Sequence, residues 1–176
     1  MLTKILIGVL CAAGALAAVV AMQPAQFEVT RKARIAAPPE KVFAMVNDFH
    51  RWEAWSPWEK LDPAMKKTFS GPEAGAGASY AWVGNSDVGE GRMTITESHP
   101  QQHIRIRLEF LKPFAATNQT EFRFTPAANE VEVSWTMTGE NNFISKAFCL
   151  FLGGMDKMIG PDFEKGLTQL RTAAAS

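Results

Sequence analysis

Apolar and polar residues alternate along much of the chain, with the two-residue period of a strand that is buried on one side. The clearest run is residues 103–110, which read His-Ile-Arg-Ile-Arg-Leu-Glu-Phe, and residues 27–35 show the same pattern near the start. Glycine and proline lie between successive runs, which predicts hairpins and therefore an antiparallel sheet with one solvated face. The shorter predicted strands are residues 66–69, 80–83, 91–97, 121–124 and 131–137, and the solvated face is expected to carry Arg105, Arg107, Glu109, Arg123, Glu132 and Thr136.

The end of the chain has the spacing of a helix instead. Apolar residues recur there every three or four positions, which predicts one long C-terminal helix. Gly160 and Pro161 must start or kink this helix, because proline lacks the backbone N–H and clashes with the preceding turn. Before it, residues 143–152 are almost continuously apolar and predict a further, buried helix. The stripe on the long helix consists of Met155, Ile159, Phe163, Leu167 and Leu170.

Another helix is predicted directly after the first strand. Pro38, Pro39 and Glu40 place proline in its first turn and a carboxylate near the positive end of its dipole. Residues 52–58 follow, with three tryptophans spaced three apart, so that the indoles fall on one side of a helical turn. Pro57 predicts the start of a second short helix within this segment.

Together these elements predict a single α+β domain over residues 27–173. A strongly twisted sheet curls, and its buried face needs a cover. The C-terminal helix is the only predicted element long enough to cover it. Because one helix cannot fill the trough of a curled sheet, we expect a curved antiparallel sheet wrapped around that helix, with an interior cavity beneath it.

Residues 1–23 do not fit that domain. Between Lys4 and Glu28 lies a long stretch without a formal charge, which is sufficient for the ~20 apolar residues of a membrane span. The same stretch fits a secretory signal peptide with small residues at its cleavage site, and a buried soluble helix is a third interpretation. Lys4 favours a cytoplasmic N-terminus, so the domain is expected outside the cytoplasm, anchored to the membrane or released to the periplasm or medium after cleavage.

Composition and charge limit the kinds of partner that the chain can bind. The chain has 176 residues, 47% of them apolar, and its 18 basic residues balance 18 acidic ones. A neutral chain lacks the basic surface of a nucleic-acid-binding protein, so no nucleic acid is expected. The two cysteines, Cys11 and Cys149, cannot form a disulfide framework. No metal or cofactor is expected either, because His99 and His103 lie on opposite sides of Pro100 and a turn rather than on one helix face.

The aromatic and methionine residues are the candidates for lining the cavity. Tryptophan offers a large flat apolar area with one N–H donor, and methionine adapts to irregular shapes. Plain packing in the core explains each of these residues singly, whereas the group as a whole favours a partly polar pocket. The candidate ligand-binding residues are Trp55, Trp58, Tyr80, Trp82, Met93, Leu108, Phe122, Trp135, Met137, Met155 and Phe163.

Two segments resemble a known family. Residues 36–43 (Ala-Ala-Pro-Pro-Glu-Lys-Val-Phe) and the tryptophan-rich residues 52–58 are similar to the opening of the START-like superfamily, also called the SRPBCC or polyketide cyclase/dehydrase and lipid transport proteins. Residues 160–167 resemble the C-terminal helix of its bacterial members. The resemblance implies a helix-grip fold with an apolar ligand between sheet and helix, although it does not imply one function.

An enzyme on this fold needs an ionisable group inside the apolar cavity, with a pKa shifted by desolvation. Arg92, Glu97 and Tyr80 are the only candidates, since their strands alternate less strictly and can point a polar group inward. A solvated or rim position is favoured for each of them, and no catalytic constellation is apparent.

Three functions remain open. The favoured one is non-catalytic binding of an apolar small molecule or lipid at the cell envelope. The second is a polyketide cyclase or dehydratase acting on aromatic or polyketide substrates. The third is a protein-interaction domain similar to the chaperone-cofactor branch of the superfamily, with a collapsed cavity and an exposed apolar patch.

Overall fold

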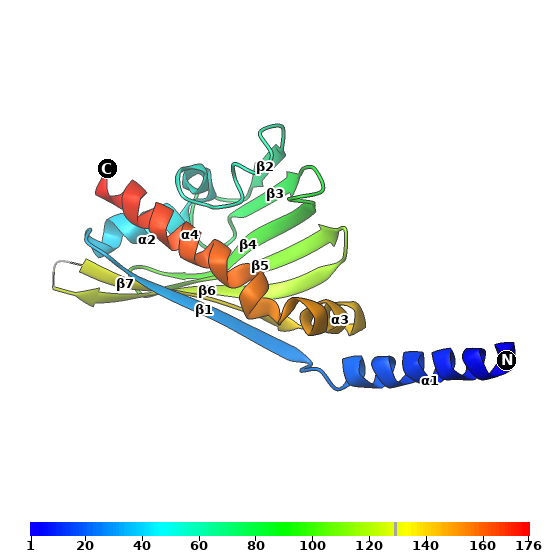
Figure 1. Ribbon diagram of the computed structural model, residues 1–176. Coiled ribbons are helices and arrows are strands. Elements are labelled where there is room, and N and C mark those ends of the chain that lie inside the picture. The colour runs from blue at the N-terminus through cyan, green and yellow to red at the C-terminus, as the bar shows by residue number, and fades with distance from the viewer. Residues whose placement is uncertain (129) are drawn as a thin grey trace.

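A seven-stranded antiparallel sheet forms the body of the protein in the computed structural model, which describes residues 1–128 and 130–176 (Figure 1). The strand order is β1-β7-β6-β5-β4-β3-β2, so every strand except β1 lies beside its neighbour in sequence. The predicted sheet is confirmed, with longer strands than the sequence pattern indicated. The strands are β1 (Gln26–Ile35), β2 (Lys66–Ser70), β3 (Ser79–Val83), β4 (Glu90–His99), β5 (His103–Lys112), β6 (Ala116–Ala127) and β7 (Glu130–Glu140).

The two faces of the sheet differ as the alternation predicts. Ile104 and Ile106 of β5 are completely buried on the inner face, and the intervening Arg105 and Arg107 lie on the outer face. Ion pairs between neighbouring strands cover that outer face, for example between Arg92 and the carboxylate of Glu109 at 2.8 Å. The inner face is therefore the one that the helices must cover.

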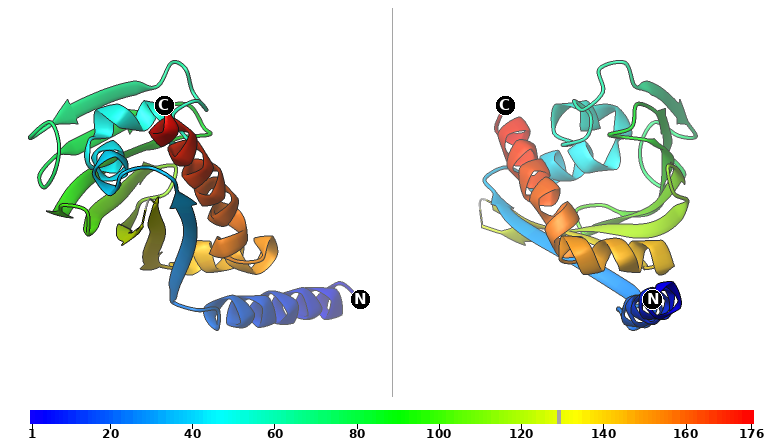
Figure 2. Two further views of the ribbon diagram at one scale, coloured as in Figure 1. Left: turned by 90° about the vertical axis from the view of Figure 1, so that its left-hand side faces the viewer. Right: turned by 45° about the vertical axis from the view of Figure 1, so that its right-hand side comes forward.

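The long C-terminal helix crosses the inner side of the sheet and packs mainly on β1 (Figures 1 and 2). This helix, α4 (Met155–Ala175), continues through Pro161, so proline does not start it. Arg31 of β1 fixes its position by ion pairs to Asp156 and Glu164, both at 2.7 Å. Gly160 is needed beneath this contact, because a Cβ there would meet the Arg31 guanidinium at 2.1 Å.

Two short helices cover the rest of the inner face. They are α2 (Pro39–Asn47) and the 3₁₀ helix η1 (Phe49–Ala54). Asp48 caps η1 by accepting a hydrogen bond from the backbone N–H of His50. The prediction that Pro57 begins a second helix is wrong: the helical turn comes before Pro57, where Asp48 can cap it, and residues 55–65 form turns.

The apolar helix before α4 is exposed, contrary to the prediction that it is buried. None of the ten residues of α3 (Phe143–Leu152), all of which the structure describes, is buried. The helix lies at one end of the sheet, beyond the trough, where only one of its sides can contact the domain (Figure 1). The segment was correctly predicted to be an apolar helix, but its position in the fold leaves its apolar side chains exposed.

The N-terminal apolar segment is a separate helix, α1 (Leu2–Ala21), that extends away from the domain (Figure 1). Only 6% of the most apolar stretch of this helix is buried. By length and composition the helix can cross a membrane. A signal sequence has the same properties. Its end lies beside α3, where Lys146 donates a hydrogen bond to the carbonyl oxygen of Ala21 at 3.1 Å.

Candidate functional site

The eleven predicted ligand-binding residues all lie in one apolar core, although strands β3 to β7, α4 and the segment after η1 contribute them separately. Eight are buried, and Trp58, Met93 and Met155 are partly buried at its edge. Five of them, which we call the aromatic cluster, contact one another through stacked or edge-on rings: Trp55, Trp58, Phe122, Trp135 and Phe163.

Trp135 of β7 is the centre of the aromatic cluster. Its ring lies parallel to that of Phe163 on α4, with centroids 4.1 Å apart, and 4.8 Å from the ring of Phe122 on β6. Trp55 and Trp58 contact it edge-on at 5.8 and 5.7 Å. These rings therefore fill the space between α4 and strands β6 and β7.

Among the described residues, the rings of the aromatic cluster contact one another where an open cavity was expected. The expectation counted α4 as the only cover, whereas η1 and the segment after it also cover the inner face and insert two indoles there. The indole N–H groups of Trp52 and Trp55 donate to the carbonyl oxygens of Val46 and Met45, both at 3.0 Å. These hydrogen bonds hold the segment against α2, so the rings stay inside.

Hollows on the surface of the described residues lie elsewhere. One of about 350 Å³ lies between η1 and the turn before β3, with Phe49, His50 and Phe69 among its lining residues. Another of about 580 Å³ has Lys41, Met45 and Ala173 in its wall. Neither is lined by a residue of the aromatic cluster, so neither opens the core at that level.

Four of the remaining predicted residues, Tyr80, Trp82, Met93 and Leu108, lie on strands β3 to β5, whereas Met137 lies on β7 and Met155 begins α4. Met93 is paired across the sheet with Tyr80 on one side and with Leu108 on the other. Around them, apolar side chains are only partly buried and form what we call the apolar margin of the core. The apolar margin consists of Phe27, Trp58, Met65, Met93, Phe110, Met155 and Ile159.

Polar atoms without partners point to a function for this region. The Thr120 hydroxyl oxygen and the Trp135 indole nitrogen are buried, and neither has a hydrogen-bond partner among the described residues. Asn118 lies two residues before Thr120 on the same face, and its side-chain amide donates a hydrogen bond to the Met137 sulfur at 3.8 Å. A buried polar group left unpaired costs about 1–3 kcal/mol, so this protein tolerates a cost that a ligand with polar atoms would remove.

Asn118 and Thr120 were missed by the sequence analysis. The predicted strand began only at residue 121, because the inward positions before it are polar and break the apolar alternation. The period of two nevertheless continues through Asn118, Thr120, Phe122 and Phe124, and extending it backward would have found both residues.

A second buried polar group lies beside Tyr80, one of the three ionisable candidates. The Tyr80 phenol donates a hydrogen bond of 2.9 Å to a carboxylate oxygen of Glu59. Lys67 of β2 makes an ion pair with the other oxygen of that carboxylate. The side chain of Glu59 is only 5% exposed, so the three groups form a largely desolvated cluster. Sequence reasoning missed Glu59 and Lys67, since nothing in their local pattern marks them.

The environment of Tyr80 makes a pH experiment possible. Burial raises the pKa of its phenol well above the ordinary value, and the negative charge and hydrogen bond of Glu59 raise it further. Tyr80 is the only tyrosine, so tyrosinate absorbance reports this residue alone. We expect no tyrosinate in the folded protein up to about pH 11, and ionisation near pH 10 in denaturant.

The same shift sets the direction of the stability change with pH. Above about pH 10 the folded state keeps a phenol proton that the unfolded chain loses, so stability should fall as the pH rises. Tyrosinate that forms near pH 10 while the far-ultraviolet circular dichroism stays native would contradict the buried position of Tyr80.

Arg92 and Glu97, the other two ionisable candidates, lie on the outer face. Arg92 pairs there with Glu109, and Glu97 accepts two hydrogen bonds from Arg105 at 2.9 and 3.0 Å. Hydrogen bonds from His103 and then from Arg105 lower the pKa of the Glu97 carboxyl. Neither residue faces the core, so of the three candidates only Tyr80 can act on a ligand there.

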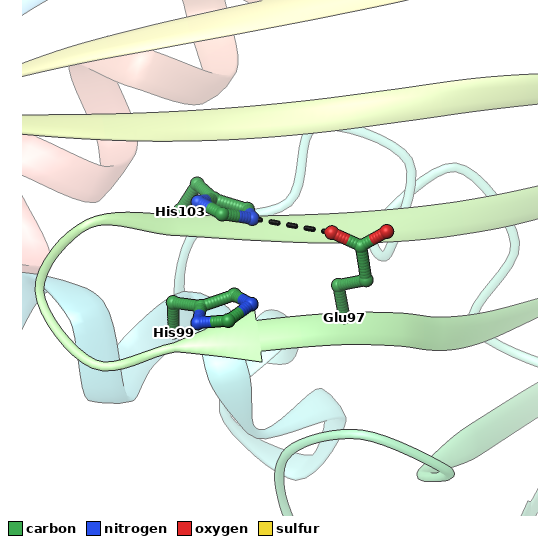
Figure 3. A group of neighbouring side chains, drawn as sticks. All are labelled: Glu97, His99 and His103. Carbon is green, nitrogen blue, oxygen red and sulfur yellow. Dashed lines mark hydrogen bonds and ion pairs between the residues drawn. The ribbon is translucent and has the colours of Figure 1, made fainter.

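Glu97 also lies close to two histidines, an arrangement that the sequence analysis did not predict. The hairpin between β4 and β5 pairs His99 directly with His103, and one ligand atom each from Glu97, His99 and His103 lie within 4.8 Å of one another (Figure 3). Imidazole and carboxylate are zinc ligands, so these three residues have the chemistry to hold a metal ion. Arg105 occupies both Glu97 oxygens, however, and a cation would have to displace it.

A bent antiparallel sheet with a long C-terminal helix against its inner face is the helix-grip fold, in which the apolar core lies between the two. The chain belongs to the polyketide cyclase/dehydrase and lipid transport family, which it matches over residues 26–175. The resemblance noted in the sequence is thus confirmed. No curated protein sequence matches the chain.

Solved structures show the same fold at low sequence identity. Protein CV1439 from Chromobacterium violaceum is 16% identical, with a TM-score of 0.59, covering 85% of this chain and 97% of that one. Protein MLL2253 from Mesorhizobium loti is 18% identical, with the same TM-score and coverage. DynU16, a putative protein of the dynemicin biosynthetic locus, is 17% identical with a TM-score of 0.56, and the match covers 85% of this chain but 47% of DynU16.

Proposed function

We propose that this domain binds an apolar small molecule or a lipid in its core, between the inner face of the sheet and α4. The observation that carries the proposal is the pair of buried, unpartnered polar atoms on Thr120 and Trp135. Both lie among apolar side chains, where a ligand with a largely hydrocarbon body and a polar group would complete the hydrogen bonding.

The apolar margin supplies the way in. Met65, Met93 and Met155 belong to it, and methionine changes shape more readily than branched or aromatic residues. A ligand enters by spreading these side chains and takes the place beside Leu108 and Met137, next to the aromatic cluster. The indole N–H of Trp135 can only donate, so the ligand must carry an acceptor such as a carbonyl or ether oxygen.

The N-terminal helix supports a location at the cell envelope. We propose that α1 anchors the chain in the membrane with the domain outside the cytoplasm, since it is exposed along its length and carries Lys4 near its start. The alternative is a signal peptide that is cleaved, which releases the domain. Mass spectrometry of the intact protein from the native membrane distinguishes the two by the presence of residues 1–23.

Thr120→Val tests the binding site directly. Valine keeps the shape and removes the unpartnered hydroxyl, so the free protein should be as stable as the wild type or slightly more stable. Affinity for the ligand should fall about tenfold, the worth of one net hydrogen bond. The ligand itself is identified by mass spectrometry of organic extracts of full-length protein purified from its native host, and affinity is then measured by quenching of the tryptophans.

Thr125→Val is the matched control, because Thr125 is exposed on the outer face of the same strand. It should change neither affinity nor stability. Extracts without a bound compound, or equal affinity in Thr120→Val and wild type, would refute the proposed site.

An enzyme is the second candidate, and the buried Tyr80–Glu59 hydrogen bond favours it. To polarise a ligand carbonyl, the neutral phenol has to turn its single proton from Glu59 to the carbonyl oxygen, which frees the Glu59 carboxylate to act as a base on the ligand. Incubation of the extracted compound with the protein decides between the candidates. A new product mass that Tyr80→Phe abolishes would establish catalysis, and an unchanged compound would leave binding as the function.

A further inference from the structure

An apolar surface at one end of the domain is exposed to solvent. It combines one face of α3 with the end of β5 and the turn that follows it, and the rings of Phe114 and Phe148 hold the two parts together at 6.4 Å. We call it the α3 surface. It consists of Leu111, Phe114, Phe143, Ile144, Phe148, Phe151 and Leu152, each between 47 and 70% exposed.

Such a surface is unusual for a domain surrounded by water. Large contiguous apolar patches on soluble domains mark contacts with another protein or with a membrane. On α3 the exposed residues Ile144, Phe148, Phe151 and Leu152 have the spacing of one helix face, which is the arrangement of a helix that lies in a membrane interface.

The position of α1 indicates which partner this is. Helix α1 and helix α3 contact each other, and Lys146 of α3 bonds to the last residue of α1. Figures 1 and 2 show α1 leaving the domain at the end where α3 lies. If α1 crosses a bilayer, the bilayer begins where α1 meets the domain, and α3 is next to that point.

We propose that the α3 surface lies in the interface of the lipid bilayer that α1 enters, and that lipid passes from there into the core. The second half of this inference rests on the proposed function. Met155 of the apolar margin begins α4 only three residues after Leu152, so the membrane surface and the entrance are neighbours. Gly153 and Gly154, both with positive φ, join the two helices in a backbone conformation that glycine adopts without strain.

Quenching by brominated lipids tests the contact with the bilayer. Full-length Phe151→Trp is reconstituted into phospholipid vesicles with bromine on the acyl chains, and the fluorescence is compared with that of the wild type. We expect the added indole to be quenched by roughly half or more and to emit at shorter wavelength, because position 151 is 70% exposed and faces the lipid.

Leu61→Trp is the matched control, since Leu61 is also an exposed apolar residue but lies in the segment before β2. Its added indole should be quenched by aqueous iodide and not by brominated lipid. Equal lipid quenching in the two variants would overturn the proposal. An indole at position 151 that neither quencher reaches would also overturn it, because a protein partner would then cover the surface.

Lipid transfer tests the second half separately. The double variant Phe148→Ser, Phe151→Ser should take up a fluorescent phospholipid from vesicles at least about tenfold more slowly, while the amount bound at equilibrium in detergent stays unchanged. Leu61→Ser should behave like the wild type. An unchanged uptake rate in the double variant would refute entry through the α3 surface. A wild-type protein that binds no phospholipid at equilibrium would refute the proposed function instead.

Discussion

Replacing Trp135 with alanine is expected to lower the free energy of unfolding by about 3–5 kcal/mol. The indole is 1% exposed and contacts four other aromatic rings, of which Phe163 on α4 is the closest. Its removal leaves a void between α4 and the sheet that these rigid neighbours cannot close. Chemical unfolding of the full-length protein in mild detergent, followed by far-ultraviolet circular dichroism, measures the loss.

Trp58→Ala is the matched control for this experiment. Trp58 contacts the same ring, but it is only partly buried in the apolar margin. Its removal should cost about half as much, because water and neighbouring side chains can enter the space. A loss below about 1 kcal/mol for Trp135→Ala would contradict a core filled by the aromatic cluster and would favour an open cavity at this level.

Glu59→Ala should cost about 3 kcal/mol, the second-largest effect that we expect. The substitution leaves the ammonium of Lys67 and the phenol of Tyr80 without their common partner in a desolvated region. This figure is at the lower end for a broken buried pair, because the Lys67 side chain is 25% exposed and can gain some water. The same unfolding measurement applies.

Two variants separate the contributions within this cluster. Tyr80→Phe removes only the hydrogen bond to Glu59 and should cost about 1 kcal/mol. Glu132→Ala removes an exposed carboxylate that pairs with Lys32 at 3.7 Å on the outer face, and it should cost well under 1 kcal/mol. If Glu59→Ala lowers the free energy of unfolding no more than Glu132→Ala does, the Glu59 carboxylate is solvated and has no role inside the core.

The strands were predictable wherever the sequence has two faces of different polarity. In β5, apolar and charged residues alternate without exception until Phe110, so the inner and outer faces could be assigned correctly. In β6 the first inward residues are polar, so the predicted strand began five residues late, at residue 121 instead of 116. The residues that make this region a candidate binding site are the ones that obscured its secondary structure.

Helix α3 illustrates a different limit. An almost continuously apolar run predicts a buried helix; the helix is confirmed, but the prediction that it is buried is wrong. Whether protein or lipid surrounds such a helix depends on its place in the fold, which a local pattern does not contain. The same limit applies to His99 and His103. Their side chains come together because of the register of the hairpin that joins β4 and β5, which the local pattern does not contain.

The sequence by itself determined the α+β architecture, the antiparallel sheet, the polarity of its two faces and the apolar N-terminal helix. Each of these follows from periodicity, because the side chains of a strand or helix face fixed directions relative to its own axis. The tertiary structure alone decided that five aromatic rings fill the space under α4 and that α3 faces outward beside α1. It also decided that the Thr120 hydroxyl and the Trp135 indole N–H have no hydrogen-bond partner among the described residues. Those features depend on which elements meet in space, and such contacts join residues too far apart in the chain for any local pattern to record.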